Sequence, residues 1–177
     1  GRFDLAPLPV AEITNGIAQG DVDGDNDQDL ITGNAGDNLW WRNEGGVFTA
    51  VRAALPGKQT ISQDVQLGDL DGDGDLDLIE ANEGRNRVLI NDGQGQFVVL
   101  EDALPDMPMR ESRQAALGDV DADGDLDVVI GNVFFGFSRR LGQDGITVDY
   151  ANRLFLNNGD ATFVLSTGLP ADEIQSP

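Results

Sequence analysis

The feature that most constrains this chain is a nine-residue acidic stretch that occurs three times. Residues 69–77 read Asp-Leu-Asp-Gly-Asp-Gly-Asp-Leu-Asp, and closely similar stretches occupy residues 21–29 and 119–127. Five carboxylates packed this closely repel one another unless a cation lies among them. Each stretch follows a glycine and precedes an apolar run, so the sequence predicts three metal-binding turns that lead into strands.

The acidic stretches belong to a longer repeat. They begin at Asp21, Asp69 and Asp119, which are 48 and 50 residues apart. Three further landmarks keep the same phase: a six-residue segment that begins and ends with Asn (38–43, 86–91, 152–157), a Phe (48, 97, 163) and a Leu-Pro pair (55–56, 104–105, 169–170). A fixed period in this range indicates a repeat architecture.

Each repeat is expected to hold four short strands. The first runs into the Gly-Asp, the second leaves the acidic turn as an apolar run, the third lies between the two Asn, and the fourth starts at the Phe. Asn and Gly after the third strand suit a hairpin turn, because both tolerate positive φ. No window shows a helical period, so the chain is predicted to be all-β.

Four antiparallel strands repeated about every fifty residues are typical of a β-propeller blade. The sequence predicts one repeat region over residues 1–177, with units at about 10–56, 57–105 and 106–170 and a leading strand within 1–9. Propellers usually close with about 4 to 8 blades. Three units are too few, so we expect a fragment of a larger propeller or a piece that associates with a second copy of itself.

Composition narrows the chemistry. The chain has 32 acidic and 11 basic residues, a net charge of −21, and neither Cys nor His. This charge disfavours nucleic acids and anionic membrane surfaces as partners, and the missing residue types exclude disulfides, thiolate or imidazole metal sites and Ser-His nucleophiles. No apolar run approaches the ~18 residues of a membrane span, and a start at Gly1 without a signal peptide suggests excision from a longer protein.

Hard oxygen ligands at alternate positions with a turn between them are what Ca²⁺ requires. Gly74 and Gly124 supply the turn in two loops, and Asn26, which also tolerates a left-handed conformation, replaces them in the first. About three calcium ions are expected. The predicted side-chain ligands are Asp21, Asp23, Asp25, Asp29, Asp69, Asp71, Asp73, Asp77, Asp119, Asp121, Asp123 and Asp127, with the backbone carbonyls of Asp27, Asp75 and Asp125 between them.

Two other interpretations of the acidic stretches remain at this stage. One is a solvated acidic turn without metal, which three copies in the same phase disfavour. The other is an EF-hand, since residues 69–80 fit its twelve-residue pattern with Glu80 in the closing position. The equivalent residues in the other units are Thr32 and Ile130, and the flanking segments resemble strands rather than helices.

The pattern Gly-Asp-x-Asp-x-Asp-Gly-x-x-Asp, followed by Asn-x-Leu-x-x-Asn-x-Gly-x-Gly-x-Phe, resembles the FG-GAP/VCBS repeat family. The resemblance covers nearly the whole chain and departs from the pattern at Asn26 and Ala122. It implies calcium-binding propeller blades of a secreted or surface bacterial protein, similar to the calcium blades of integrin α-subunit propellers. Such repeats occur in adhesins, in lectin-like proteins and as appendages of enzymes, so the family indicates fold and metal better than biological role.

The last unit departs from the others by an insertion of sixteen residues between its second and third strands. This insertion should project from the end of the blade opposite the calcium loops, where integrin-like propellers bind partners. It carries a possible protein- or glycan-binding surface of Phe134, Phe135, Phe137, Arg139, Arg140 and Tyr150. Packing of these aromatic side chains over a neighbouring blade is the alternative. Trp40 and Trp41 align with apolar residues of the other units and are expected in the core between blades.

The favoured function at this stage is a calcium-stiffened, non-catalytic module for adhesion or glycan recognition. Two alternatives stay open: a catalytic or non-catalytic propeller part of a polysaccharide-acting enzyme, and a purely structural role within a larger host. The enzyme is disfavoured because the clustered acids are assigned to metal loops and the chain holds one Tyr, one Lys and no His.

Overall fold

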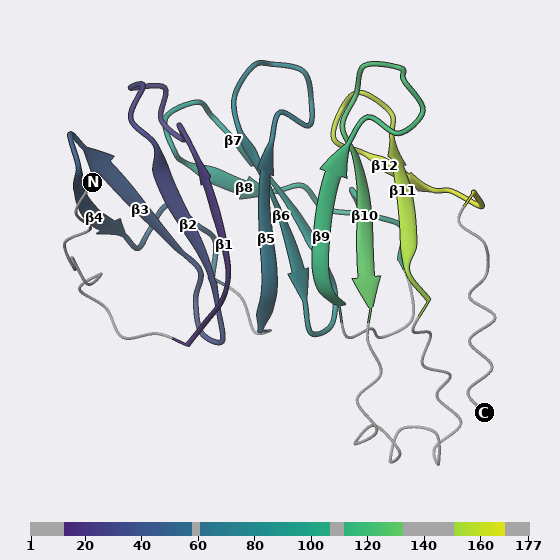
Figure 1. Ribbon diagram of the computed structural model, residues 1–177, viewed down its shortest axis with the longest axis horizontal. Helices are drawn as coiled ribbons and strands as arrows, with labels where there is room; N and C mark the ends of the chain where they lie inside the picture. Colours follow the sequence, from purple (N-terminus) through teal and green to yellow (C-terminus); the bar gives the residue numbers. More distant parts are fainter. Residues whose placement is uncertain (1–12, 58–60, 107–111, 133–150, 169–177) are drawn as a thin grey trace, which may run out of the picture.

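The computed structural model describes residues 13–57, 61–106, 112–132 and 151–168. In these segments all regular structure is β, and the strands form three four-stranded antiparallel sheets in which chain order is also sheet order (Figure 1). The first sheet holds β1 (Thr14–Gly20), β2 (Asp29–Asn34), β3 (Leu39–Glu44) and β4 (Val47–Val51). The second holds β5 (Ser62–Gly68), β6 (Asp77–Asn82), β7 (Arg87–Asn91) and β8 (Phe97–Val99). The third holds β9 (Ser112–Gly118), β10 (Asp127–Asn132), β11 (Arg153–Asn157) and β12 (Phe163–Leu165).

The prediction of an all-β chain built from four-stranded antiparallel units is confirmed. The three sheets lie side by side with β1, β5 and β9 next to one another, so the described residues form an open row of blades rather than a closed ring (Figure 1). The leading strand expected within residues 1–9 lies outside the described residues, and so does the expected insertion. The described part of the chain contains no helix that would cross a membrane.

The three sheets share one register. Leu30 pairs with Trp41 in the first sheet, as Leu78 pairs with Leu89 in the second, and Val128 with Phe155 in the third. Each sheet also has one irregularity between its first two strands, near their end away from the acidic loops. The 48- and 50-residue spacing in the sequence therefore corresponds to structurally equivalent positions.

The second strand of each sheet is its most buried element. Every residue of β6 is buried, and five of the six residues of β2 are buried. Each of these strands lies between two strands of its own sheet, and β6 is in addition covered on both faces, because Leu78 packs in one inter-sheet cluster and Ile79 in the other. Burial on both faces is why β6 is apolar at adjacent positions as well as alternate ones.

Two apolar clusters hold the row together, one between each pair of neighbouring sheets. Trp40 is 3% exposed and packs with residues of the second sheet, which confirms its predicted place in the core between blades. Trp41 is 2% exposed but belongs to neither cluster. Trp41 donates a hydrogen bond from Nε1 to Thr32 Oγ1 at 3.1 Å. The first cluster contains Ala18, Val22, Ile31, Trp40, Ala54, Leu55, Val65, Leu78, Leu89 and Phe97. The second contains Leu70, Ile79, Ala81, Val88, Ala103, Leu104, Ala115, Val128, Ile130, Phe155, Ala161 and Phe163.

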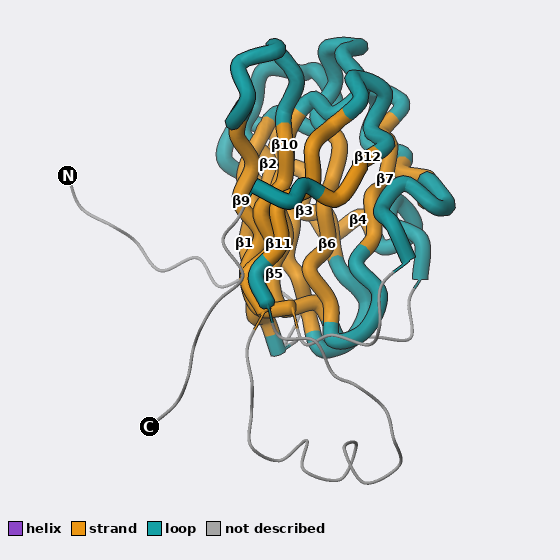
Figure 2. The backbone as a smooth tube through the Cα atoms, turned by 90° about the vertical axis from the view of Figure 1, so that its right-hand side faces the viewer, coloured by secondary structure: helices purple, strands orange, loops and turns teal. Residues whose placement is uncertain are grey.

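The three acidic loops all lie at the same ends of the strands, along one edge of the row of sheets (Figure 1). Figure 2 shows the loops and turns gathered at the ends of the upright strands. Within the first sheet, the β1–β2 loop meets the β3–β4 turn, because Gly45 N donates to Asp27 Oδ2 at 2.7 Å. The β2–β3 and β6–β7 turns therefore lie at the opposite end, as expected for an up-and-down blade.

Candidate metal centres

Each acidic stretch forms the loop between the first and second strands of its sheet. The fourth and sixth loop positions have positive φ in all three copies, at Gly24 and Asn26, Gly72 and Gly74, and Ala122 and Gly124. Asn26 has a φ of 70° and Ala122 a φ of 64°, in the left-handed region that glycine favours. The expectation that Asn26 takes the turn position of Gly74 is confirmed.

The first aspartate of each loop organises the turn through its side chain. Asp69 Oδ1 accepts from Gly72 N at 2.8 Å, and its Oδ2 accepts from Gly74 N at 3.1 Å. Asp21 and Asp119 likewise accept two backbone N–H bonds each from the residues four and five positions on. These bonds curl the loop around the carboxylate and bring the following aspartates toward it.

The last aspartate of each loop is buried and ties the loop to the third strand. Asp77 Oδ2 accepts from Leu70 N at 3.0 Å, and Asp77 Oδ1 accepts from Asn91 N at 2.9 Å. Asp29 and Asp127 make the same pair of bonds in their own sheets. Sequence reasoning assigned these residues to metal only, whereas the structure also gives them a role in joining loop and sheet.

Burial makes the charge of these carboxylates unfavourable when no cation is near. Burial is the largest cause raising the pKa of Asp77 to about 6, against the lowering effect of its two backbone hydrogen bonds, and the charges of Asp71 and Asp73 add to the increase. Burial likewise raises the pKa of Asp29, Asp71 and Asp121. A bound cation would favour the ionised carboxylates and offset this cost.

Three close groups of carboxylate oxygens result, one in each loop. The second group joins Asp69, Asp71 and Asp77, and the third joins the equivalent Asp119, Asp121 and Asp127, with the ligand atoms of each group within 4.8 Å of one another. The first group differs, since it consists of Asp21, Asp23 and Asp25 and omits Asp29. The predicted ligands Asp73 and Asp123 also lie outside the close groups and remain predictions.

The seventh loop position was predicted to offer its backbone carbonyl, and that role remains a prediction. Its side chain faces the turn between the third and fourth strands. Asp27 accepts from Gly45 N, and a Cβ added to Gly93 or Gly159 would collide with the carboxylate of Asp75 or Asp125. The positive φ of Gly93 (73°) and Gly159 (82°) and this close approach together explain the glycine in both turns.

The EF-hand interpretation of residues 69–80 fails, because β-strands flank the loop. Glu80 lies inside β6, fully buried, where Oε1 accepts from Asn38 Nδ2 of the first sheet at 2.6 Å and Oε2 lies 3.4 Å from Arg87 Nη1. Glu80 is thus part of a polar contact between sheets and not of the metal loop.

Sequence reasoning missed a cross-sheet bond at each of the first two loops. Asn91 Nδ2, at the end of β7, donates to Val22 O in the first acidic loop at 2.8 Å, and Asn157 Nδ2 donates to Leu70 O in the second loop at 2.8 Å. The regular recurrence of this Asn was the available signal. It was interpreted as turn chemistry because the acceptor belongs to the preceding repeat.

The residues present fit a hard divalent cation. Each loop offers at least three carboxylate oxygens in one close group, and in the first loop Asp23 Oδ1 is buried without a hydrogen-bond donor. Oxygen-only donor sets of this kind suit Ca²⁺ or Mg²⁺, whereas zinc usually takes nitrogen or sulfur ligands as well. When bound, such an ion would supply positive charge that holds the loop carboxylates together.

Sheets of this topology, each with an acidic loop after its first strand, define a repeat protein made of β-propeller-like blades. Residues 21–80 and 69–130 each match the FG-GAP-like repeat, and together these segments cover more than half of the chain. The chain therefore belongs to the FG-GAP-like repeat family. A search of curated proteins finds no match to this chain. The predicted ligand surface of Phe134, Phe135, Phe137, Arg139, Arg140 and Tyr150 lies outside the described residues.

Proposed function

We propose that the chain is a calcium-stabilised binding module of a secreted or surface protein, in which the ions support the fold. The observation that carries this proposal is the position of the acidic loops. The first two lie directly on the junctions between sheets, since Val22 and Leu70 accept hydrogen bonds from the next sheet. A cation that orders these loops would therefore also order the junctions.

Titration calorimetry tests the metal assignment directly. Calcium added to chelator-treated protein should bind with a stoichiometry above one, and magnesium should bind more weakly because the loops offer many flexible carboxylate oxygens. Exchange of Asp71, a member of the close group of the second loop, for Asn should abolish one site. Glu101→Gln is the matched control, since Glu101 is an exposed acid outside the loops. Absence of calcium binding at millimolar concentration would overturn the proposal.

We further propose that recognition of a protein or glycan takes place at the strand ends opposite the acidic loops. In the described residues, a surface pocket of about 340 Å³ lies there, lined by Gly57 and by residues 85–88 and 99–104 of the second unit. Arg85, Arg87, Glu101 and Asp102 contribute to its lining, and Arg85 Nη2 lies 2.8 Å from Asp102 Oδ1. Charged groups beside an apolar wall would suit a polar ligand such as a sugar.

A glycan and protein binding screen in calcium and in chelator tests this second proposal. Arg85→Ala should weaken a ligand bound in the pocket and leave calcium binding unchanged, because Arg85 lies at the opposite end of its sheet from the loops. A ligand whose affinity is the same with Arg85→Ala would place recognition elsewhere.

We propose a non-catalytic role for the chain, and turnover of any glycan by the purified protein would contradict it.

The proposed structural partner is another blade of a longer chain or a second copy. Gly20 and Gly68 face the Leu76 and Leu126 side chains of the following sheet, while a Cβ on the equivalent Gly118 would meet nothing within 4 Å. Sedimentation analysis should detect self-association if a second copy covers this face.

A further inference from the structure

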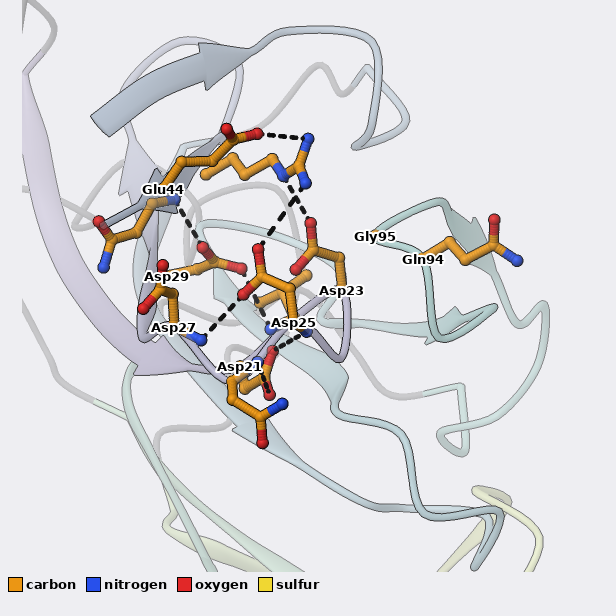
Figure 3. Close-up of polar contacts among 12 residues, drawn as sticks. Asp21, Asp23, Asp25, Asp27, Asp29, Glu44, Gln94 and Gly95 are labelled. Carbon is orange, nitrogen blue, oxygen red and sulfur yellow. Dashed lines mark hydrogen bonds and ion pairs between the residues drawn. The ribbon is translucent and has the colours of Figure 1, made fainter. Parts of the chain in front are cut away.

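The first acidic loop differs from the other two by an arginine. Arg42 lies on β3 at the position that Ile90 occupies on β7 and Leu156 on β11. Its guanidinium group reaches into the loop, where Nε lies 2.6 Å from Asp23 Oδ2 and Nη2 lies 3.7 Å from Asp25 Oδ2 (Figure 3). Both carboxylates belong to the close group of the first loop.

The contact neutralises charge without completing the hydrogen bonding of the site. Arg42 Nε contacts Asp23 Oδ2 only, and Asp23 Oδ1 is buried without a hydrogen-bond donor. The Asp23 side chain is only 9% exposed, so water does not readily replace the missing donor. The loop thus keeps an unsatisfied ligand oxygen beside the Arg42 side chain, which is 40% exposed.

A second acid offers the guanidinium group an alternative partner. Glu44 Oε1 lies 2.9 Å from Arg42 Nη1, outside the close group of carboxylates, and the Glu44 side chain is 66% exposed. Arg42 can therefore leave Asp23 and Asp25 and still keep one ion pair. This exchange needs a change of side-chain rotamers only, because Arg42 and Glu44 lie on the same strand.

We propose that Arg42 is a built-in counter-cation of the first loop, which a metal ion must displace in order to bind there. The proposal rests on the proposed calcium-binding function. In its observed position, the Arg42 charge repels a divalent cation and occupies two of the carboxylates that the cation would need as ligands. The second and third loops, which have Ile90 and Leu156 at this position, therefore fill first, and the first loop fills last. A half-exposed ion pair of this kind corresponds to roughly a two- to fivefold loss of affinity.

The experiment uses the full chain with the second and third loops disabled by Asp71→Asn and Asp121→Asn, so that calorimetry reports on the first loop alone. Arg42→Leu, which introduces the residue of the third sheet, should tighten calcium binding about two- to fivefold. Arg42→Gln, which keeps length and polarity, should do the same, and it serves if Arg42→Leu folds poorly. Arg42→Lys keeps the charge and should remain close to the parent.

Asn26 is the other departure in this loop, and a separate variant distinguishes its effect. Asn26→Gly should change affinity less than Arg42→Gln, because Asn26 already adopts the left-handed conformation. Equal affinity in the parent, Arg42→Leu and Arg42→Gln proteins, with calcium still bound by the unmodified chain, would overturn the role of Arg42 alone. Calcium binding by none of the proteins would overturn the proposed function together with it.

Discussion

Asn91 Nδ2 donates a hydrogen bond to Val22 O at 2.8 Å and so joins the third strand of one blade to the acidic loop of the blade before it. The same side chain donates to Leu76 O in its own loop at 3.1 Å and accepts from Gly95 N at 3.0 Å. One buried amide therefore connects two successive acidic loops and a hairpin turn. Asn157 repeats the connection one blade further on.

Exchange of Asn91 for Ala should destabilise the protein by about 2 kcal/mol, because Val22 O would be left buried without this donor and Leu76 O, which is partly buried, would lose its bond as well. Asn43 is the matched control. It is the equivalent residue of the first blade and donates to Gln28 O at 3.0 Å, a bond within its own sheet, so Asn43→Ala should cost less. Urea unfolding of both variants measures the difference, and equal losses would argue against a contribution of the cross-sheet bond.

Gly95→Ala should be more destabilising than a typical glycine substitution. Its Cβ would lie 2.5 Å from ring atoms of the buried Trp40, and Gly95 has a φ of 80°. Backbone strain alone costs about 1–2 kcal/mol, and crowding of the core adds about 1–3 kcal/mol.

Gly46→Ala separates these two effects, since Gly46 also has positive φ, at 92°, but a Cβ there would meet nothing within 4 Å. The loss of stability in Gly46→Ala should therefore correspond to backbone strain alone. In a Trp40→Leu background, Gly95→Ala should cost less stability than it does in the parent protein. If both glycine variants unfold at the same urea concentration, the contact between Gly95 and Trp40 does not restrict this position.

Removal of calcium should lower thermal stability. At a calcium concentration one hundred times the dissociation constant, each independent site contributes about 2.7 kcal/mol to the free energy of unfolding. Differential scanning calorimetry in millimolar calcium and in excess chelator measures the combined contribution of all sites as a difference in melting temperature. The difference should shrink in Asp71→Asn and stay unchanged in Glu101→Gln. An identical melting temperature in calcium and chelator would exclude a structural role for the ions.

The buried ion pair of Glu80 and Arg87 can be tested by replacing both residues with their equivalents in the first blade. Thr32 and Leu39 occupy the same paired positions there. Glu80→Thr alone should destabilise the protein by about 3 kcal/mol, because Arg87 keeps a largely buried charge without its carboxylate. Adding Arg87→Leu should restore most of this loss, since well-packed apolar residues often replace a buried ion pair at little cost. Chemical denaturation of the single and double variants decides the matter.

Most of the blade architecture could be predicted from the sequence, because a blade is local. Its four strands lie within about fifty residues, and the acidic loop, the paired Asn and the Phe each recur at a fixed phase. The buried second strand was predictable for the same reason, since burial on both faces requires adjacent apolar residues such as Leu78 and Ile79.

Contacts between blades could not be predicted in this way. Asn38 donates to Glu80 across 42 residues, and the partners of Asn91 and Asn157 are 69 and 87 residues away. Such pairs depend on how neighbouring sheets pack. Arg42 is an intermediate case: its departure from Ile90 and Leu156 is visible in the repeat, but only the folded blade shows that its guanidinium reaches Asp23.

The cross-sheet amides have a consequence for how the molecule comes apart. A row of repeats unfolds as one unit only when the coupling between neighbours exceeds the difference in their intrinsic stabilities. Here the coupling bonds end on the acidic loops of the first two blades, so calcium would set the length over which unfolding is cooperative. With the loops filled the blades should melt in a single transition, and with the loops empty the terminal blades should fray ahead of the middle one.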